Sequence, residues 1–527
     1  MAAINFGVNI IEIVTEGLYS NSLDTFREYI QNSCDAIDDA IDAGTLTEGD
    51  GEVKITIDNR ARRITIKDNG IGISSAPRGF VRIMSNIGNS DKSLKTDRGF
   101  RGIGRLCGLA YCKTLIFSSK VAGEKKISTL TINAEELRKE FFDGNRRSAE
   151  EVLSQRMIFD TIDTNSNEHF FKVELIDINE TNTDLLNVEK VREYLSFVAP
   201  VPYRNYFCEQ AKIYEHAKSL NFKITEYKIL VNGEQVVKNY KSSLSGKTGK
   251  DEIFDLKFRN FYDESGNLIA WSWIGLTTFK GIIQQTKENP NQMRCIRLRV
   301  GNIQIGNEFA LRKLFPDETR GITYFVGEIY TVNTDLRPTT KRDYFEENSA
   351  RNILEKELRK YFEELDKLYN FASASRSLFK AVNAPQKIQQ EFERRSAAYQ
   401  KSHRNAFEAT MILLKEKATK AKEKLTEIQE DIKSNPDKSL SKVFEQIAKQ
   451  YPIPPLLGKA NNSEEKYEAI SNTSTKKTPL KKQKDFPPST WSRDERNIYY
   501  VIEAIITDNP KLAGDKLLEK IKEEFTK

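Results

Sequence analysis

The chain has 527 residues, more than one hydrophobic core usually organises, so we expect three or four domains. Its net charge of +6 is too small to indicate a nucleic-acid binder by itself. Five scattered cysteines without a CxxC pair argue against a disulfide framework or a zinc site, and three distant histidines argue against a catalytic triad. No uncharged apolar run is long enough to cross a bilayer, and no basic region precedes the first apolar stretch, so we expect a cytoplasmic protein.

The first part of the chain combines helix and strand patterns. Residues 4–44 predict helix, because apolar side chains recur near a 3.6-residue period. Residues 53–57 and 63–67 alternate apolar and polar side chains on either side of a polar turn, which predicts a β-hairpin. A region punctuated by glycines follows over 68–108. Further strands are expected at 114–118 and 170–178.

The middle of the chain, about 203–345, predicts a second domain of the α+β class. Its strand-like runs lie at 227–231, 268–274, 296–305 and 324–332.

From about residue 350 the sequence is helical and highly charged. Eight apolar residues between Phe407 and Ile432 follow a heptad spacing, which predicts either a helical hairpin within the chain or a short coiled coil with another chain. Residues 459–490 are polar and rich in lysine, so they indicate a flexible linker, with a tail that contacts nucleic acid as the alternative. A last helical segment is expected over about 493–527.

Three short segments carry residues suited to chemistry, and the first lies on the predicted N-terminal helix. Glu28, Asn32 and Asp35 are spaced i, i+4 and i+7, so they share one face of a helix. A carboxylate next to a carboxamide can place a general base beside a magnesium-bound phosphate. The same spacing is also common on solvated helices.

The second segment, Asp68-Asn69-Gly70-Ile71-Gly72, directly follows a predicted strand. A carboxylate at the end of a strand can accept a hydrogen bond from an exocyclic amino group, and the glycines let a ligand approach the backbone. A simple turn is the alternative interpretation.

The third segment, Arg98 to Arg105, has glycines at 99, 102 and 104 and leads into an apolar run that predicts a helix. Glycines that open a helix expose backbone N–H groups to phosphate. The spacing matches neither a Walker P-loop nor a Rossmann fingerprint.

The order and contexts of the three segments resemble the Bergerat ATP-binding fold of the GHKL class, which includes gyrase, histidine kinases and MutL. The sequence is most similar to the ninety-kilodalton heat-shock chaperone family over its first two-thirds. Leu18 to Ala36 resembles that family's first helices, and Ile87 to Ser93 its segment before the lid. Gly99 to Lys120 resembles its glycine lid and the next strand, and Asp335 to Asp343 its middle-domain catalytic loop.

The resemblance implies a Mg²⁺-dependent ATPase with a site shared between two domains. Glu28 would be the general base, Asn32 would hold Mg²⁺ at the phosphates, and Asp68 would bind the adenine amino group. Arg342 would reach the γ-phosphate from the second domain. The other nucleotide contacts implied by the resemblance are Asp35, Gly70, Gly72, Asn86, Ser90, Lys92, Gly99, Gly102, Ile103 and Gly104.

The expected fold is α+β, with a Bergerat α/β sandwich, a transducer-like middle domain and a helical C-terminal region with a short coiled coil. The expected segments are 1–200 (ATPase domain), 201–375 (middle domain), 376–458 (helical region), 459–490 (linker) and 491–527 (C-terminal helical segment).

The chain departs from the family in two places. The family's Gly-Thr pair on a late strand is replaced by a run beginning at His169, and nothing beyond about residue 375 matches the family's dimerisation domain. We expect a homodimeric conformational machine with a protein client or partner, by analogy in a multi-protein system such as defence against phage. The alternatives are a MutL- or MORC-like clamp that acts on DNA through the lysine-rich part, or a nucleotide-binding scaffold without turnover.

Overall fold

The computed structural model describes residues 21–87, 103–142, 147–246, 249–280, 291–316, 321–395 and 401–451. These residues form two compact units: one contains the described residues up to Ser373 together with Pro436–Gln446, and the other contains those between Ala374 and Asn435 and those from Ile447 on. The expected linker and the last helical segment lie outside the described residues. Within the described ranges, no helix is both long and apolar enough to pass through a membrane.

An eight-stranded sheet dominates the first part of the chain, with the strand order β5-β4-β3-β6-β2-β1-β7-β8. Every neighbouring pair is antiparallel except β1 and β7, which are parallel. The strands are β1 (Glu52–Asp58), β2 (Arg63–Asp68), β3 (Cys112–Lys120), β4 (Lys126–Asn133), β5 (Met157–Asp163), β6 (Phe170–Ile178), β7 (Lys228–Val231) and β8 (Glu234–Gln235). Because β7 and β8 belong to this sheet, it extends past residue 200, the expected end of the first domain.

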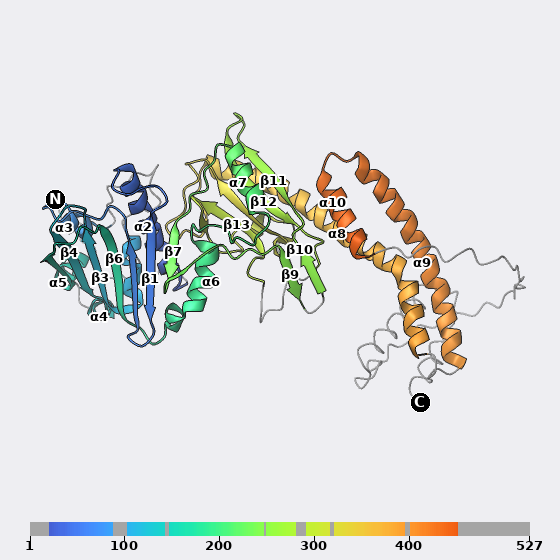
Figure 1. Ribbon diagram of the computed structural model, residues 1–527, viewed down its shortest axis with the longest axis horizontal. Helices are drawn as coiled ribbons and strands as arrows, with labels where there is room; N and C mark the ends of the chain where they lie inside the picture. The colour runs from blue at the N-terminus through green and yellow to red at the C-terminus, as the bar shows by residue number, and fades with distance from the viewer. Residues whose placement is uncertain are drawn as a thin grey trace, which may run out of the picture. The chain divides into compact units, whose positions relative to one another are not determined.

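Helices cover one face of this sheet (Figure 1). The hairpin predicted at 53–57 and 63–67 is confirmed as β1 and β2, with Ile55 opposite Ile66. Buried and exposed positions alternate along β1, as expected for a strand with one covered face. α2 packs on β1 and β2, α4 on β3, and α5 on β4 and β5. The helical elements of this region are α2 (Asp24–Asp42), α3 (Phe80–Ser85), η1 (Gly104–Ala110), α4 (Ala134–Phe142), α5 (Ala149–Arg156), η2 (Thr183–Leu186) and α6 (Val188–Val198).

A second, five-stranded sheet has the order β11-β12-β15-β13-β14. Its strands are β11 (Asp255–Tyr262), β12 (Leu268–Leu276), β13 (Cys295–Val300), β14 (Ile303–Ile305) and β15 (Val326–Thr331); β9 (Ser243–Gly246) and β10 (Gly249–Glu252) form a separate hairpin. The prediction of one strand over 296–305 is wrong. Gly301 and Asn302 both have positive φ, so the chain reverses there and forms the β13–β14 hairpin.

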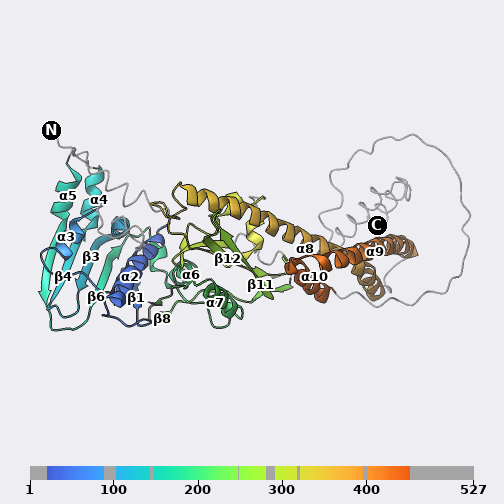
Figure 2. The same ribbon diagram turned by 90° about the horizontal axis from the view of Figure 1, so that it is seen from above.

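Helices complete the described chain: α7 (Gln210–Ser219), the short η3 (Arg312–Leu314) and η4 (Gly321–Tyr324), α8 (Ser349–Arg395), α9 (Lys401–Ser434) and α10 (Lys438–Gln450). The first part of α8 runs along the second sheet (Figure 2), where the rings of Phe261 and Tyr361 are in contact. In the second unit, the end of α8 lies beside α9, and the rings of Phe392 and Phe407 stack with centroids 3.8 Å apart. Most of the apolar residues with heptad spacing between Phe407 and Ile432, including Met411 and Leu425, are buried within this unit. This burial is what a helical hairpin within the chain requires.

The core of the second sheet contains a fully buried ionic cluster built around Glu328. Lys238 donates to Glu328 Oε2 at 3.1 Å, and Arg299 donates to Glu328 Oε1. Tyr330 and Tyr240 donate to the same carboxylate at 2.7 and 3.1 Å. Burial alone would raise the pKa of Glu328, but the two cations and the hydroxyl donors hold it well below its usual range.

This cluster contains two cations and one carboxylate, so its members are not equivalent. Burial and the neighbouring Arg299 lower the pKa of Lys238 to about 7, despite its pairing with Glu328. Glu328 is therefore the counter-ion on which both cations depend. Arg299 also donates to the carbonyl of Phe197 at the end of α6, at 2.8 Å.

Glu328→Gln should lower the free energy of unfolding by about 3–5 kcal/mol, because it removes the carboxylate that pairs directly with two buried cations. Lys238→Met should cost less, since the Arg299–Glu328 pair survives. The pKa of Glu328 is lower in the folded protein than in the unfolded chain. The stability that its ion pairs contribute in the wild type is therefore present above the unfolded-state pKa near 4.5 and is lost as the pH falls below it.

Urea unfolding followed by tryptophan fluorescence measures the free energy of unfolding of the wild type and both variants, because Trp271 and Trp273 lie in the same core. Equal midpoints for the two variants would contradict the assignment of Glu328 as the shared counter-ion.

Candidate functional site

The first candidate site residues lie on α2, where the sequence places them one and two turns apart. Glu28 and Asp35 are buried, with 3% of each residue exposed, and Asn32 is half-buried. A polar residue rarely faces the interior of an amphipathic helix unless another element supplies its partners. The buried face of α2 therefore contains both apolar core residues and a carboxylate.

The partner of Glu28 comes from far along the chain. Arg342 places its Nε 2.8 Å from Glu28 Oε1, and its side chain is only 13% exposed. Arg27 lies on the other side of the carboxylate, with its Nε 3.7 Å from the same oxygen and its Nη1 3.5 Å from Asp24. Two guanidinium groups thus flank one buried carboxylate, whose Oε1 meets them as ion pairs without accepting a hydrogen bond among the described residues.

A tight backbone turn presents Arg342 to Glu28. Arg342 has φ of 53°, a left-handed conformation that costs a non-glycine residue about 1–3 kcal/mol. Gly306 N–H donates to the carbonyl of Arg342 at 2.7 Å, and Arg342 N–H donates to the carbonyl of Thr339 at 3.0 Å. Gly306 itself has φ of 65°, and a Cβ there would lie 2.5 Å from the carbonyl oxygen of Asp343. The β13–β14 hairpin, which ends at Gly306, therefore holds the strained turn in place.

Asp68 ends β2 and organises the loop that follows it. Its Oδ1 accepts from the backbone N–H of Gly70 at 3.0 Å and of Phe171 at 3.2 Å. Burial raises the pKa of Asp68 to about 6, although hydrogen bonds from Ser33 and these amides oppose the shift. Gly72 is required for this loop, since its φ is 72° and a Cβ would lie 2.2 Å from the carbonyl oxygen of Lys120.

His169 stands where a glycine was expected from the family pattern, and it supports the same loop. Its Nδ1 lies 2.8 Å from the carbonyl oxygen of Gly70. A carbonyl oxygen only accepts, so Nδ1 carries the proton. His169, directly before β6, and Ser33 on α2 thus support the Asp68 loop. His169 does so at the place where the chain lacks the family's Gly-Thr pair.

The end of the glycine segment is attached to α2 by the residue next to Glu28. Tyr29 donates its hydroxyl to the carbonyl of Arg105 and accepts from Gly108 N–H, both at 3.0 Å. Arg105 in turn donates to the backbone carbonyls of Ile83 (2.9 Å) and Asn86. Burial lowers the pKa of this guanidinium to about 10. Ile103 and Gly104 lie at the start of η1, so the apolar run after the glycines forms a 3₁₀ helix.

The structure places some of the expected site residues in contact, and others lie outside the residues that it describes. It joins Glu28 to Arg342, and Asp68 to Gly70. Asn86 is connected to the glycine segment through Arg105. Ser90, Lys92, Gly99 and Gly102 lie outside the described residues. Sequence reasoning missed Arg27, Tyr29, Ser33, Arg105 and His169 as site residues; the long-range contacts of the last four could not be deduced from local spacing.

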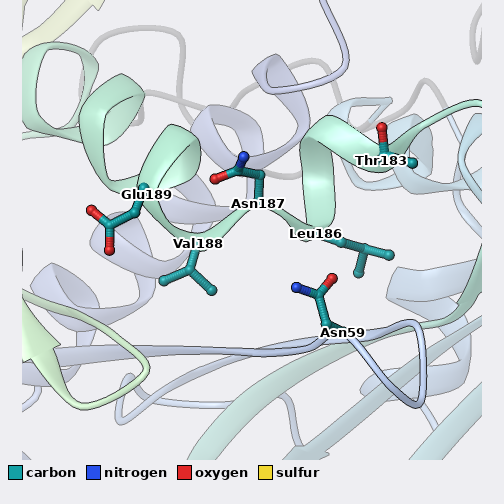
Figure 3. Close-up of a pocket in the computed structure, with 6 residues that line it drawn as sticks. All are labelled: Asn59, Thr183, Leu186, Asn187, Val188 and Glu189. Carbon is teal, nitrogen blue, oxygen red and sulfur yellow. The ribbon is translucent and has the colours of Figure 1, made fainter.

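A separate surface pocket of about 390 Å³ lies between the β1–β2 turn and the start of α6 (Figure 3). Its lining residues are Asn59, Thr183, Leu186, Asn187, Val188 and Glu189. Glu189 is the single ionisable side chain among them, and it points away from the others in Figure 3. This pocket therefore offers no paired groups for catalysis.

Residues 22–164 match a family model described as histidine kinase-, DNA gyrase B- and HSP90-like ATPase. The chain is 33% identical over 131 residues to the chaperone protein HtpG of Psychrobacter cryohalolentis, covering 22% of this chain and 20% of the relative. It is 45% identical over 71 residues to HtpG of Bordetella pertussis, covering 12% and 11%. The matches span about a fifth or less of these relatives' own length, and the family model ends before Arg342.

Asp68→Asn should raise the free energy of unfolding by about 2 kcal/mol near pH 7.5, because the wild type must bury an ionised carboxylate there. The folded-state pKa of about 6 lies above the unfolded value, so wild-type stability falls as the pH rises through this interval. The advantage of the variant should shrink near pH 5. Melting temperatures of both proteins at the two pH values test this, and a wild type more stable than the variant near pH 7.5 would refute it.

Proposed function

We propose that this chain, whose residues 22–164 match the histidine kinase-, DNA gyrase B- and HSP90-like ATPase family, binds Mg·ATP and hydrolyses it at a site completed by Arg342. The ion pair between Glu28 and Arg342 carries the proposal. It supports a catalytic site in which the first sheet's helix supplies the base and the second sheet's loop supplies a cation.

Glu28 is suited to activate water because it is buried yet held at a defined position. A general base must lie within hydrogen-bond reach of the proton it accepts, and ion pairs with Arg27 and Arg342 restrict where the Glu28 carboxylate can lie. Its Oε1 accepts no hydrogen bond among the described residues, so it keeps the capacity to accept one from water. In this proposal Glu28 accepts a proton from the water that attacks the γ-phosphate.

Arg342 is suited to serve both the base and the phosphate. It contacts Glu28 through Nε, and a guanidinium group carries further N–H donors of the kind that bind phosphoryl oxygens. One side chain can therefore hold the base and neutralise charge that develops on the γ-phosphate. Phosphoryl transfer depends mostly on such positioning and charge neutralisation.

Asn32 fits the role of a magnesium ligand. It lies one turn beyond Glu28 on α2 and offers a carboxamide oxygen, a ligand that Mg²⁺ accepts. Within the described residues no cluster of three or more His, Cys, Asp or Glu side chains could hold a metal alone. This agrees with Mg²⁺ sites that use one or two protein oxygens together with substrate phosphates, where the ion neutralises phosphate charge.

The Asp68 loop fits the nucleobase end of the site. The carboxylate, when ionised, can accept from the adenine amino group while the amides of Gly70 and Phe171 hold it in place. Gly72 permits close approach of a ligand to the backbone. The glycines of the third segment would cradle the phosphates and hinge a lid, and Tyr29 anchors the end of that segment beside Glu28.

A site shared between two sheets supports coupling of ATP turnover to movement. If ATP binding strengthens the contact between α2 and the Arg342 loop, and hydrolysis relaxes it, chemistry drives a conformational cycle. The similarity to chaperone proteins supports a protein as the client, and we extend the proposal to a homodimer that acts on such a client.

Glu28→Gln should reduce steady-state ATP turnover by at least about 100-fold, because the amide cannot accept the proton. ATP affinity, measured by calorimetry, should remain close to that of the wild type, since the base does not anchor the nucleotide. Glu189→Gln is the matched control, an exposed helical glutamate outside the site, and should keep full turnover. Wild-type protein that shows no turnover with Mg²⁺, or Glu28→Gln that matches the wild type, would sink the enzyme proposal.

A further inference from the structure

A cavity of about 650 Å³ lies next to the Glu28–Arg342 pair, and the proposed function assigns no ligand to it. The start of α2, α6, the β13–β14 hairpin and the loop at Lys341–Asp343 surround it. Five basic residues line it, from α2, α6, β13 and the loop at Lys341–Asp343: Arg27, Lys190, Arg297, Lys341 and Arg342. Lys190 is already paired with Asp184, at 2.8 Å.

Arg297 is the notable member of this lining, because it is a buried cation with neutral partners. It is 4% exposed, and it donates to the Gln304 side chain at 2.8 Å and to the carbonyl of Gln292. Its guanidinium lies over the ring of Phe197, 4.3 Å from the centroid. Its Nε is buried without a hydrogen-bond partner among the described residues. A buried charge normally needs a counter-ion, and no carboxylate in the described ranges forms an ion pair with Arg297.

The carboxylates around the cavity are engaged or exposed. Asp24 accepts from the hydroxyl of Tyr194 at 2.7 Å and pairs with Arg27. Asp343 accepts from Thr339 at 2.6 Å.

The two remaining acids of the lining are Glu308, which lies 3.7 Å from Arg294, and Glu193, which is exposed to water. Water screens an exposed charge far more than a buried one, so Glu193 compensates Arg297 weakly. The cavity therefore keeps an excess of positive charge at its buried end.

We propose that this cavity binds a phosphate-class oxyanion, for which Arg297 is the buried counter-ion and Lys341 a second cation at the rim. Guanidinium groups bind phosphate oxygens through charge-assisted hydrogen bonds. The anion has two sources, which share this chemistry: inorganic phosphate released by hydrolysis at the adjacent Glu28, or a phosphate-bearing solute from outside. The first source rests on the proposed function, and the binding site itself does not.

Titration of the full chain with inorganic phosphate, without nucleotide, tests the site by calorimetry. We expect saturable binding at one site, at least a tenfold loss of affinity in Arg297→Gln, and a weaker loss in Lys341→Gln. Lys356→Gln, an exposed lysine on α8, is the matched control and should bind as the wild type does. Lys341 is exposed, so its variant keeps the test valid if Arg297→Gln does not fold.

Asn32→Ala separates this cavity from the proposed nucleotide site and should leave phosphate affinity unchanged. The proposal is overturned if phosphate does not bind saturably, if both cavity variants bind like the wild type, or if binding disappears in Asn32→Ala instead.

Inhibition of ATP turnover by added phosphate then identifies the source. Inhibition that weakens in Lys341→Gln supports the hydrolysis product, whereas phosphate binding without inhibition supports an external solute. If the chain proves to have no ATPase activity, the calorimetric result still decides whether the anion site exists.

Discussion

The contact between Arg342 and Glu28 is the interaction on which the proposed site depends, because the two residues lie more than 300 positions apart. Glu28 is on the helix that packs on the first sheet, and Arg342 is in a loop attached to the β13–β14 hairpin of the second sheet. A buried carboxylate and a buried guanidinium stabilise a site only when other groups fix their geometry. Here each partner is held by its own support. α2 is anchored through Tyr29 to the glycine segment, and the Arg342 turn is anchored through Gly306 to the β13–β14 hairpin.

α6 connects these two supports. Tyr194 of α6 donates to Asp24 at the start of α2, at 2.7 Å. About one turn further along α6, the carbonyl of Phe197 accepts from Arg299, and its ring packs under Arg297. Arg299 belongs to the buried cluster around Glu328. The distance between Glu28 and Arg342 is therefore set by a continuous set of packed elements from the first sheet to the core of the second.

Local patterns predicted the parts of the fold that are local. The β1–β2 hairpin followed from alternation, and β3, β6, β7, β12 and β15 from apolar runs, whereas β4, β5 and β8 to β11 were not predicted. Glu28 and Asp68 stood out from short motifs. The ionic cluster could not be predicted, because Arg297 and Arg299 alternate with apolar residues along β13 just as solvent-facing residues do, yet almost all of β13 is buried. Ser33 and His169 likewise support Asp68 only once α2, β2 and β6 are side by side. A site shared by Glu28 and Arg342 was expected only from the family resemblance, which placed Arg342 at the γ-phosphate; the ion pair between the two side chains was not predicted.

ATP hydrolysis by Arg342→Ala in the full chain tests the central claim most directly, with ATP binding measured on the same protein. If Arg342 completes the site, single-turnover hydrolysis falls by at least about 100-fold while ATP affinity stays close to the wild-type value. Arg342→Lys should recover little of the loss, because lysine lacks the planar fork that can contact carboxylate and phosphate together. Hydrolysis by Arg342→Ala at the wild-type rate would contradict a catalytic site shared between the two sheets.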